Sequence, residues 1–90
     1  MIRKHCLFSG KVQGVFFRAN TRDKAKEKGV KGWVKNLRDG RVEAVFEGPE
    51  GKVNEVIEFC KKNQPHARVE DVEIEEEEPT GEFDSFRVKR

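Results

Sequence analysis

The sequence predicts an α+β fold, a ferredoxin-like βαββαβ sandwich in which an antiparallel sheet carries two helices on one face, plus a short C-terminal strand. Three observations predict it. The apolar patterns run in the order strand, helix, strand, strand, helix, strand. The two middle strands are joined by a short turn that ends in Asp-Gly. The chain of 90 residues, 34% hydrophobic, can build one modest core but not two. We therefore expect a single domain over residues 1–90.

The first half of the chain supplies one strand and one helix. "HCLFSGKV" (residues 5–12) alternates as a strand does, with Cys6 and Phe8 on one face. "RANTRDKAKEK" (residues 18–28) reads as a helix that Gly29 closes. The apolar face of this helix is thin, so propensity carries the prediction more than periodicity does; its candidates are Ala19, Ala25 and Phe17.

The second half supplies a hairpin, a helix and two strands. "VKGWVKN" (30–36) and "RVEAVFEG" (41–48) flank the turn and read as paired strands. The clearest helix is "PEGKVNEVIEFCKKN" (49–63), and its apolar stripe is Val53, Val56, Ile57 and Cys60. "ARVEDVEIEEEE" (67–78) reads as a strand in which Val72 and Ile74 alternate with polar residues, and "FDSFRVK" (83–89) as a short final strand.

This order of elements has a consequence for chemistry. Right-handed crossovers place the first and second strands parallel, with the third lying antiparallel between them. The carboxyl ends of the first two strands then meet at one edge of the sheet. The turn at residues 13–18 and the strand end at Asn36 should therefore be neighbours in space.

The turn "GKVQGVFFR" (residues 10–18) has the features of an anion cradle. Gly14 permits backbone conformations that other residues avoid, and the turn leads into a helix whose first N–H groups lack intrahelical partners. Such N-termini bind anions, and Arg18 adds a fork that can hold two phosphate oxygens. The alternative is an ordinary strand-to-helix turn in which Arg18 pairs with a nearby acid.

Together with "GWVKNLRDGRVEAVFEG", this turn resembles the acylphosphatases, small enzymes of similar length and element order. The likeness covers nearly the whole chain, including "GPEGKVNEVIEF" and the stretch at Ala67-Arg68-Val69. The first motif is close to family-specific in its glycine, Val-Gln-Gly and Phe-Arg positions. Leu37 departs from the pattern, because some members have a small hydroxyl residue there; we assign it no role.

The resemblance implies an acid anhydride hydrolase that converts acyl phosphates to carboxylate and inorganic phosphate. It implies that the arginine at position 18 and main-chain amides of the turn bind the phosphoryl group, and that Asn36 holds the attacking water through its side-chain amide. It implies neither a metal nor an organic cofactor, and a phosphate oxygen serves as the base. The catalytic residues so implied are Arg18 and Asn36; the substrate-binding residues are Gln13, Gly14, Val15, Phe16, Phe17 and Arg18.

Charge and composition exclude little and are compatible with a small anionic substrate. Residues 1–41 hold 12 Lys/Arg against 3 Asp/Glu, whereas residues 42–90 hold 7 against 14. Such an uneven field can steer an anion toward the basic part, although two solvated faces would look the same. The N-terminus has no long apolar run, so we expect a cytoplasmic monomer with no membrane segment and no nucleic-acid partner.

The remaining reactive side chains favour structural roles. Cys6 and Cys60 fall on the predicted sheet–helix interface and are expected to be buried thiols; a disulfide is possible but would have to span a lengthwise offset. His5 and His66 look isolated in sequence. The acidic tract Glu75–Glu78 is more typical of a charge-protected edge strand than of a cation site. Trp33 is expected to serve packing.

Two other functions remain open at this point. The domain could keep its cradle but act as a non-catalytic phosphate or carbamoyl-phosphate binding module. Less favoured is an RNA-binding ferredoxin-like domain, because the third strand offers Glu43 and Glu47 where base-stacking aromatics would be needed. The sequence singles out no residue that would select among acyl phosphates, so it does not determine the physiological substrate.

Overall fold

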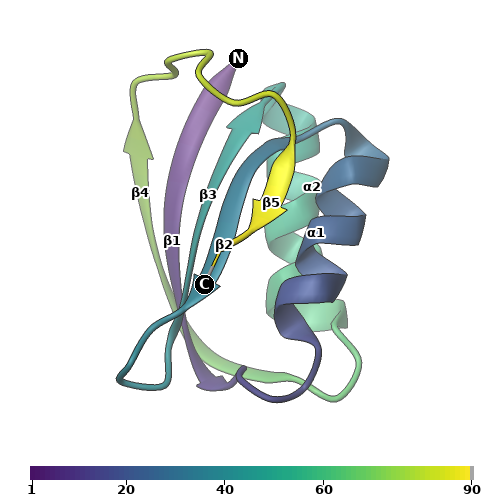
Figure 1. Ribbon diagram of the computed structural model, residues 1–90, viewed down its shortest axis with the longest axis vertical. Helices are drawn as coiled ribbons and strands as arrows, with labels where there is room; N and C mark the ends of the chain where they lie inside the picture. The colour runs from purple at the N-terminus through teal and green to yellow at the C-terminus, as the bar shows by residue number, and fades with distance from the viewer. Residues whose placement is uncertain (90) are drawn as a thin grey trace.

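The computed structural model describes residues 1–89, which form one five-stranded sheet with two helices against one of its faces (Figure 1). The strand order is β4-β1-β3-β2-β5. The first four strands pair antiparallel, and β5 pairs parallel to β2, which makes the sheet mixed. The elements are β1 (Ile2–Lys11), α1 (Phe17–Lys28), β2 (Lys31–Asn36), β3 (Val42–Gly48), α2 (Glu50–Glu58), the π-helical turn η1 (Phe59–Asn63), β4 (Arg68–Glu77) and β5 (Phe86–Val88).

The expected fold class and element order are confirmed. The first and second strands run parallel with the third between them, as the crossover rule requires. Three predicted boundaries differ by more than one residue. β1 begins at Ile2 rather than His5, β5 spans only Phe86–Val88 rather than 83–89, and the second helix changes at Phe59 into a wider π turn. Within residues 1–89 no helix is long and apolar enough to cross a membrane.

The core lies between the sheet and the helices, because alternate strand residues point to the same face. Cys6 faces Ala44 on β3 and Ile74 on β4, and the first two of these are fully buried. Ile74 is 44% exposed because β4 is an edge strand that extends beyond the cover of the helices. The predicted alternation of β4 is therefore present, but it buries less than expected.

Helix α1 buries a different residue from the one expected. Its inward stripe is Phe17, Thr21 and Ala25, at spacings of four, whereas Ala19 is only partly buried. Thr21 is tolerated in the core because its hydroxyl accepts a hydrogen bond from Gln64 Nε2 at 2.7 Å. Gln64 also donates to the carbonyl of Phe17 at 3.2 Å, so it fixes the first turn of α1.

The two cysteines are free and buried, as expected. Burial raises the pKa of the Cys6 thiol to about 12, with a smaller contribution from Cys60, and raises the pKa of Cys60 to about 11. Both therefore stay protonated and weakly reactive at neutral pH. We expected a lengthwise offset between the two cysteines on the premise that Cys6 starts its strand. This premise is wrong because β1 starts at Ile2, four residues before Cys6.

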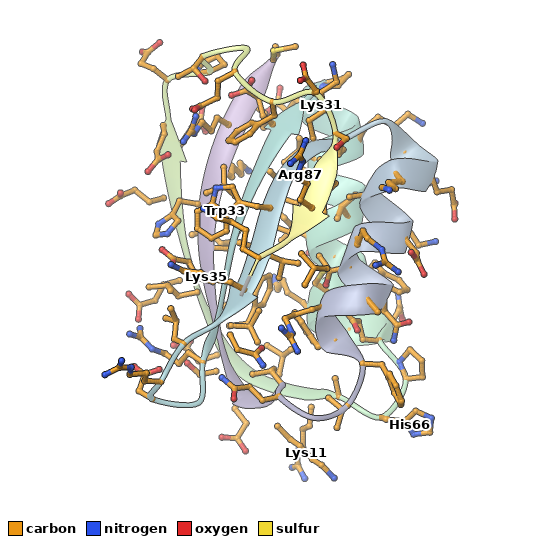
Figure 2. The ribbon with its side chains drawn as sticks, viewed as in Figure 1. Lys11, Lys31, Trp33, Lys35, His66 and Arg87 are labelled. Carbon is orange, nitrogen blue, oxygen red and sulfur yellow. The ribbon has the colours of Figure 1, made fainter. Side chains whose placement is uncertain are left out.

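The segment between β4 and β5 crosses the open face of the sheet (Figure 1). Glu47 anchors it: this carboxylate is only 3% exposed and accepts hydrogen bonds from the main-chain N–H of Thr80 and Gly81 at 3.0 and 2.8 Å. Trp33 and Arg87 lie on the same open face (Figure 2). Trp33 is half-buried beneath the ammonium groups of Lys35 and Lys89, so it contributes packing on that face and reports on folding.

Candidate active site

A cavity of about 670 Å³ opens where β1 and β2 end and α1 begins. It receives residues from the β1–α1 turn, the first turns of α1, the end of β2 and the end of β5. Two of its lining residues are arginines, and Asp, Glu and His are absent from the described lining. The lining residues are Val12, Gly14, Phe16, Phe17, Arg18, Ala19, Arg22, Asn36 and Val88.

The two side chains expected to do the chemistry meet in this cavity. Arg18 and Asn36 both line it, although 18 positions separate them in the sequence. Arg18 forms no ion pair or hydrogen bond with any residue in 1–89. The side-chain oxygen Oδ1 of Asn36 is buried and has no hydrogen-bond partner within the same range. Buried amide oxygens are rarely left without a partner, so this one is suited to accept a hydrogen bond from a ligand or water.

The main chain of the turn is arranged so that several N–H groups are available. Gly14 and Phe16 both adopt left-handed backbone conformations, with φ of 73° and 62°. Phe16 is the N-cap of α1, and neither a capping side chain nor an acidic residue in the first turn neutralises this helix end. The first intrahelical bond runs from Asn20 N–H to the Phe16 carbonyl, at 3.0 Å. The amides before it lack intrahelical acceptors, and such a helix end attracts an anion.

Phe16 is unusual in two respects. A bulky residue with positive φ is a genuine backbone outlier, which costs of order 1–3 kcal/mol and persists only where its surroundings enforce it. Its side chain is also 76% exposed, at the rim of the cavity. Strain of this kind clusters at functional sites, which favours a role for the turn in binding.

Two of the expected site residues lie behind the cavity. The side chain of Gln13 donates to the carbonyls of Leu37 and Arg41 at 2.8 and 2.9 Å, so it ties the turn to the hairpin that follows Asn36. Val15 is buried in the core. Neither side chain lines the cavity, so any role that Gln13 and Val15 have in binding substrate falls to their main-chain groups.

Four lining residues were not anticipated from the sequence: Val12, Ala19, Arg22 and Val88. Arg22 was within reach of sequence reasoning, because it stands four positions after Arg18 on the same predicted helix and so on the same face. Val88 was not, because the pairing of β5 beside β2 depends on a long connection. The hydrogen bonds from Gln64 to α1 could not be predicted either, because they join residues that are far apart in the sequence.

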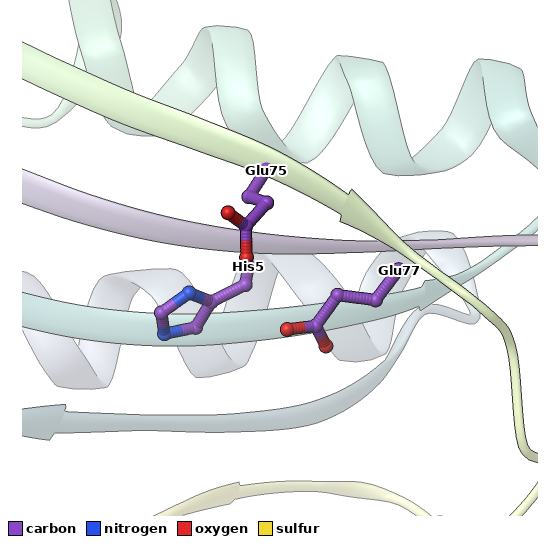
Figure 3. Close-up of side chains that lie close together, drawn as sticks. All are labelled: His5, Glu75 and Glu77. Atoms are coloured by element: carbon purple, nitrogen blue, oxygen red, sulfur yellow. The ribbon is translucent and has the colours of Figure 1, made fainter.

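His5 is not isolated, contrary to the expectation from its sequence neighbours. Figure 3 shows it on β1 beside Glu75 and Glu77 of β4, and one ligand-type atom from each lies within 4.8 Å of the others. Protein groups already engage this cluster: His5 Nε2 is 2.6 Å from a Glu43 oxygen, and Arg3 Nε donates to Glu77 at 3.0 Å. None of these residues lines the cavity. His66 is exposed in a turn.

The backbone of the turn makes a stability prediction. A Cβ at Gly14 would meet nothing within 4 Å, so only its φ of 73° penalises alanine, and Gly14→Ala should lower the free energy of unfolding by about 1 kcal/mol. Gly51 has equally open space but lies in α2 without a positive φ, so Gly51→Ala should raise it by up to about 1 kcal/mol. Urea unfolding followed by Trp33 fluorescence measures both. Equal effects from the two substitutions would contradict this account.

These features define the class of protein: a small α+β protein with a cationic cavity at the start of a crossover helix. A family model described as Acylphosphatase matches residues 4–88. The chain belongs to the acylphosphatase family, and it is an acylphosphatase enzyme.

Individual relatives agree with this assignment. An acylphosphatase of Haloquadratum walsbyi is 57% identical over 88 residues, which cover 98% of this chain and 94% of that protein. One from Rubrobacter xylanophilus is 58% identical over 81 residues, covering 90% and 74%. Among solved structures, the acylphosphatase from Bacillus subtilis superposes with a TM-score of 0.94 at 33% identity and covers all of both chains. The resemblance noted in the sequence is thereby confirmed.

Proposed function

We propose that this acylphosphatase hydrolyses the carboxyl–phosphate anhydride of acyl phosphates by in-line attack of a water molecule at phosphorus. The proposal rests on one observation: the same cavity is lined by the Arg18 guanidinium and by Asn36, whose side-chain oxygen Oδ1 is buried, and neither group has a protein partner within residues 1–89. The guanidinium is suited to bind an anion, and the amide oxygen is suited to accept a hydrogen bond from water.

The phosphoryl group binds at the start of α1. Arg18 grips two of its oxygens with the guanidinium fork, and the main-chain N–H groups between Gln13 and Arg18 surround the others. Because no acidic side chain is among the described lining residues, no carboxylate of residues 1–89 in this cavity repels a phosphate dianion. Donors fixed in place before the reaction stabilise the developing charge by roughly 3–4 kcal/mol each.

The attacking water is held from the neighbouring strand. It donates a hydrogen bond to Oδ1 of Asn36, and its oxygen attacks phosphorus opposite the acyl oxygen. The new P–O bond forms as the bond to the acyl oxygen breaks, and the electron pair leaves with the carboxylate. A carboxylate, whose conjugate acid has a pKa of about 4, is a good leaving group and needs no general acid.

The proton of the attacking water goes to a phosphoryl oxygen. The described cavity lining contains no carboxylate or imidazole that could accept it. The products are then a carboxylate and monoprotonated or diprotonated phosphate, according to pH. The protein supplies position and charge stabilisation rather than acid–base chemistry, and fixing water against its target accounts for several kcal/mol of a barrier.

Isotope labelling tests this route. The native chain is expected to release phosphate from benzoyl phosphate in EDTA and, in ¹⁸O-labelled water, to place one labelled oxygen per turnover in phosphate and none in benzoate. Label in benzoate would show attack at the carbonyl carbon and overturn the mechanism. Retained phosphate binding without turnover would favour the non-catalytic binding module instead.

A further inference from the structure

The cavity has more room and more positive charge than a phosphoryl group requires. Its volume of about 670 Å³ falls in the range of pockets that enclose whole small molecules, so the acyl group has space inside it as well. Two arginines line it, and one of them, Arg18, suffices for the proposed phosphoryl site. The second, Arg22, has no part in that chemistry.

Arg22 lies one helical turn beyond Arg18 on α1. Residues four apart on a helix share a face, about 6 Å apart along the axis. Both arginines line the same cavity, so Arg22 adds a second cation about one helical turn from the proposed phosphoryl position. A substrate whose acyl group extends along α1 from that position can meet this second cation.

The protein itself makes little use of the Arg22 charge. Only Nε is engaged, by an oxygen of the adjacent Asp23 at 3.1 Å. The side chains of Arg22 and Asp23 are 39% and 67% exposed, and exposed pairs of this kind contribute at most about 1 kcal/mol. The terminal N–H groups have no partner within residues 1–89 and remain available to a ligand.

The lining between and around the two arginines suits a carbon skeleton. Val12, Phe16 and Val88 contribute apolar surface to the same cavity. A ligand that matches all of it has a phosphoryl group, a short apolar body and a second anion. This is the description of an acyl phosphate whose acyl group carries a carboxylate or a further phosphate.

We propose that Arg22 is a specificity-determining residue that favours acyl phosphates bearing a second anionic group over neutral ones. The inference rests on the proposed function, because it assigns the acyl side of the same site. A neutral acyl group leaves Arg22 solvated, whereas an anionic one gains a charge-assisted hydrogen bond. Such bonds change affinity by about tenfold or more.

The experiment uses a pair of substrates that differ by one negative charge and one methyl group. These are 3-carboxybenzoyl phosphate and its carboxyl methyl ester, with benzoyl phosphate as the reference. The native chain is expected to show kcat/KM about tenfold higher for the carboxylate than for the ester. In Arg22→Gln the ratio should fall to about 1, and Arg22→Lys should restore part of it, since a lysine keeps the charge without the fork.

The matched control is Lys26→Gln. Lys26 is exposed on α1 one further turn along, does not line the cavity, and its loss changes the net charge by the same amount. Its carboxylate-to-ester ratio should stay near the native value. An equal fall in Lys26→Gln would attribute the preference to long-range steering and overturn the proposal.

Two failures are distinguishable in the same data. If the native chain hydrolyses benzoyl phosphate but treats the carboxylate and the ester alike, the role of Arg22 is wrong and the proposed function stands. If it hydrolyses none of the three, the proposed function itself fails. Fluorescence of Trp33 in each variant confirms that a changed ratio does not come from a changed fold.

Discussion

Replacing Arg18 by alanine is expected to lower kcat/KM for benzoyl phosphate by about 10³-fold or more while the protein stays folded. The loss follows from the proposed mechanism, in which Arg18 is the side chain that holds the phosphoryl oxygens in both ground and transition state. Removal of a single preorganised donor costs about 10²–10³ in rate, and arginines that act on phosphoryl groups are worth more. Phosphate release at several substrate concentrations measures the loss.

Folding should survive because Arg18 makes no ion pair or hydrogen bond within residues 1–89. The free energy of unfolding is therefore expected to change by no more than about 0.5 kcal/mol. Inhibition by inorganic phosphate gives a second readout: it should weaken strongly in Arg18→Ala. Arg18→Lys should recover only part of the activity, because an ammonium is a point charge without the planar fork. Full activity in the lysine variant would contradict bidentate binding.

The fold was predictable because each element is indicated by a pattern within its own short stretch of sequence. Strand alternation at Cys6 and Phe8, the four-residue spacing on the second helix, and the Asp-Gly turn each specify an element independently, and handedness then leaves few topologies. The weak element was α1, where Ala19 was expected inside and Thr21 is found there. A buried threonine is not recognisable in sequence, because its hydroxyl is satisfied by Gln64, 43 residues away.

The two central residues of the candidate site could be predicted from the sequence, but several of the residues and contacts around them could not. Arg18 and Asn36 could be placed together because β1 and β2 run parallel on either side of β3, so their carboxyl ends lie at the same edge of the sheet. What sequence reasoning missed depends on side chains that meet across strands. Examples are the contact of His5 with Glu43 and the bonds from Gln13 to the hairpin. Such contacts have no fixed spacing, so only the three-dimensional structure reveals them.

Asn36→Ala is the second large effect, and it should separate catalysis from binding. We expect kcat for benzoyl phosphate to fall about 10²–10³-fold, because the attacking water loses the group that positions it. KM and inhibition by inorganic phosphate should change little, since the phosphoryl group is held by α1 and not by β2. Arg18→Ala, by contrast, should lose phosphate binding together with turnover. A parallel loss of phosphate binding would place Asn36 in the phosphate site instead.

The stability of the same variant provides an independent check. Oδ1 of Asn36 accepts no hydrogen bond from any residue in 1–89, so Asn36→Ala breaks no hydrogen bond of this oxygen within the described protein. Its free energy of unfolding should therefore fall by no more than about 1 kcal/mol. An enzyme variant that is inactive yet no less stable would indicate that the asparagine is kept for function. A clear loss of stability would instead indicate a structural role.

Asn36→Asp distinguishes a hydrogen-bonding role from one of size alone. Aspartate keeps the shape and the Oδ1 acceptor, so geometry by itself predicts more activity than alanine retains. It also adds a negative charge beside the phosphoryl group in a cavity where the described lining has no other acid. Like charges at close range disfavour binding and raise the barrier to attack on an anion.

We therefore expect Asn36→Asp to be less active than Asn36→Ala at pH 7. The deficit should shrink as the pH falls toward the pKa of the new carboxyl, where the charge is lost. Activity above that of Asn36→Ala across this range would show that charge at this position is of little consequence.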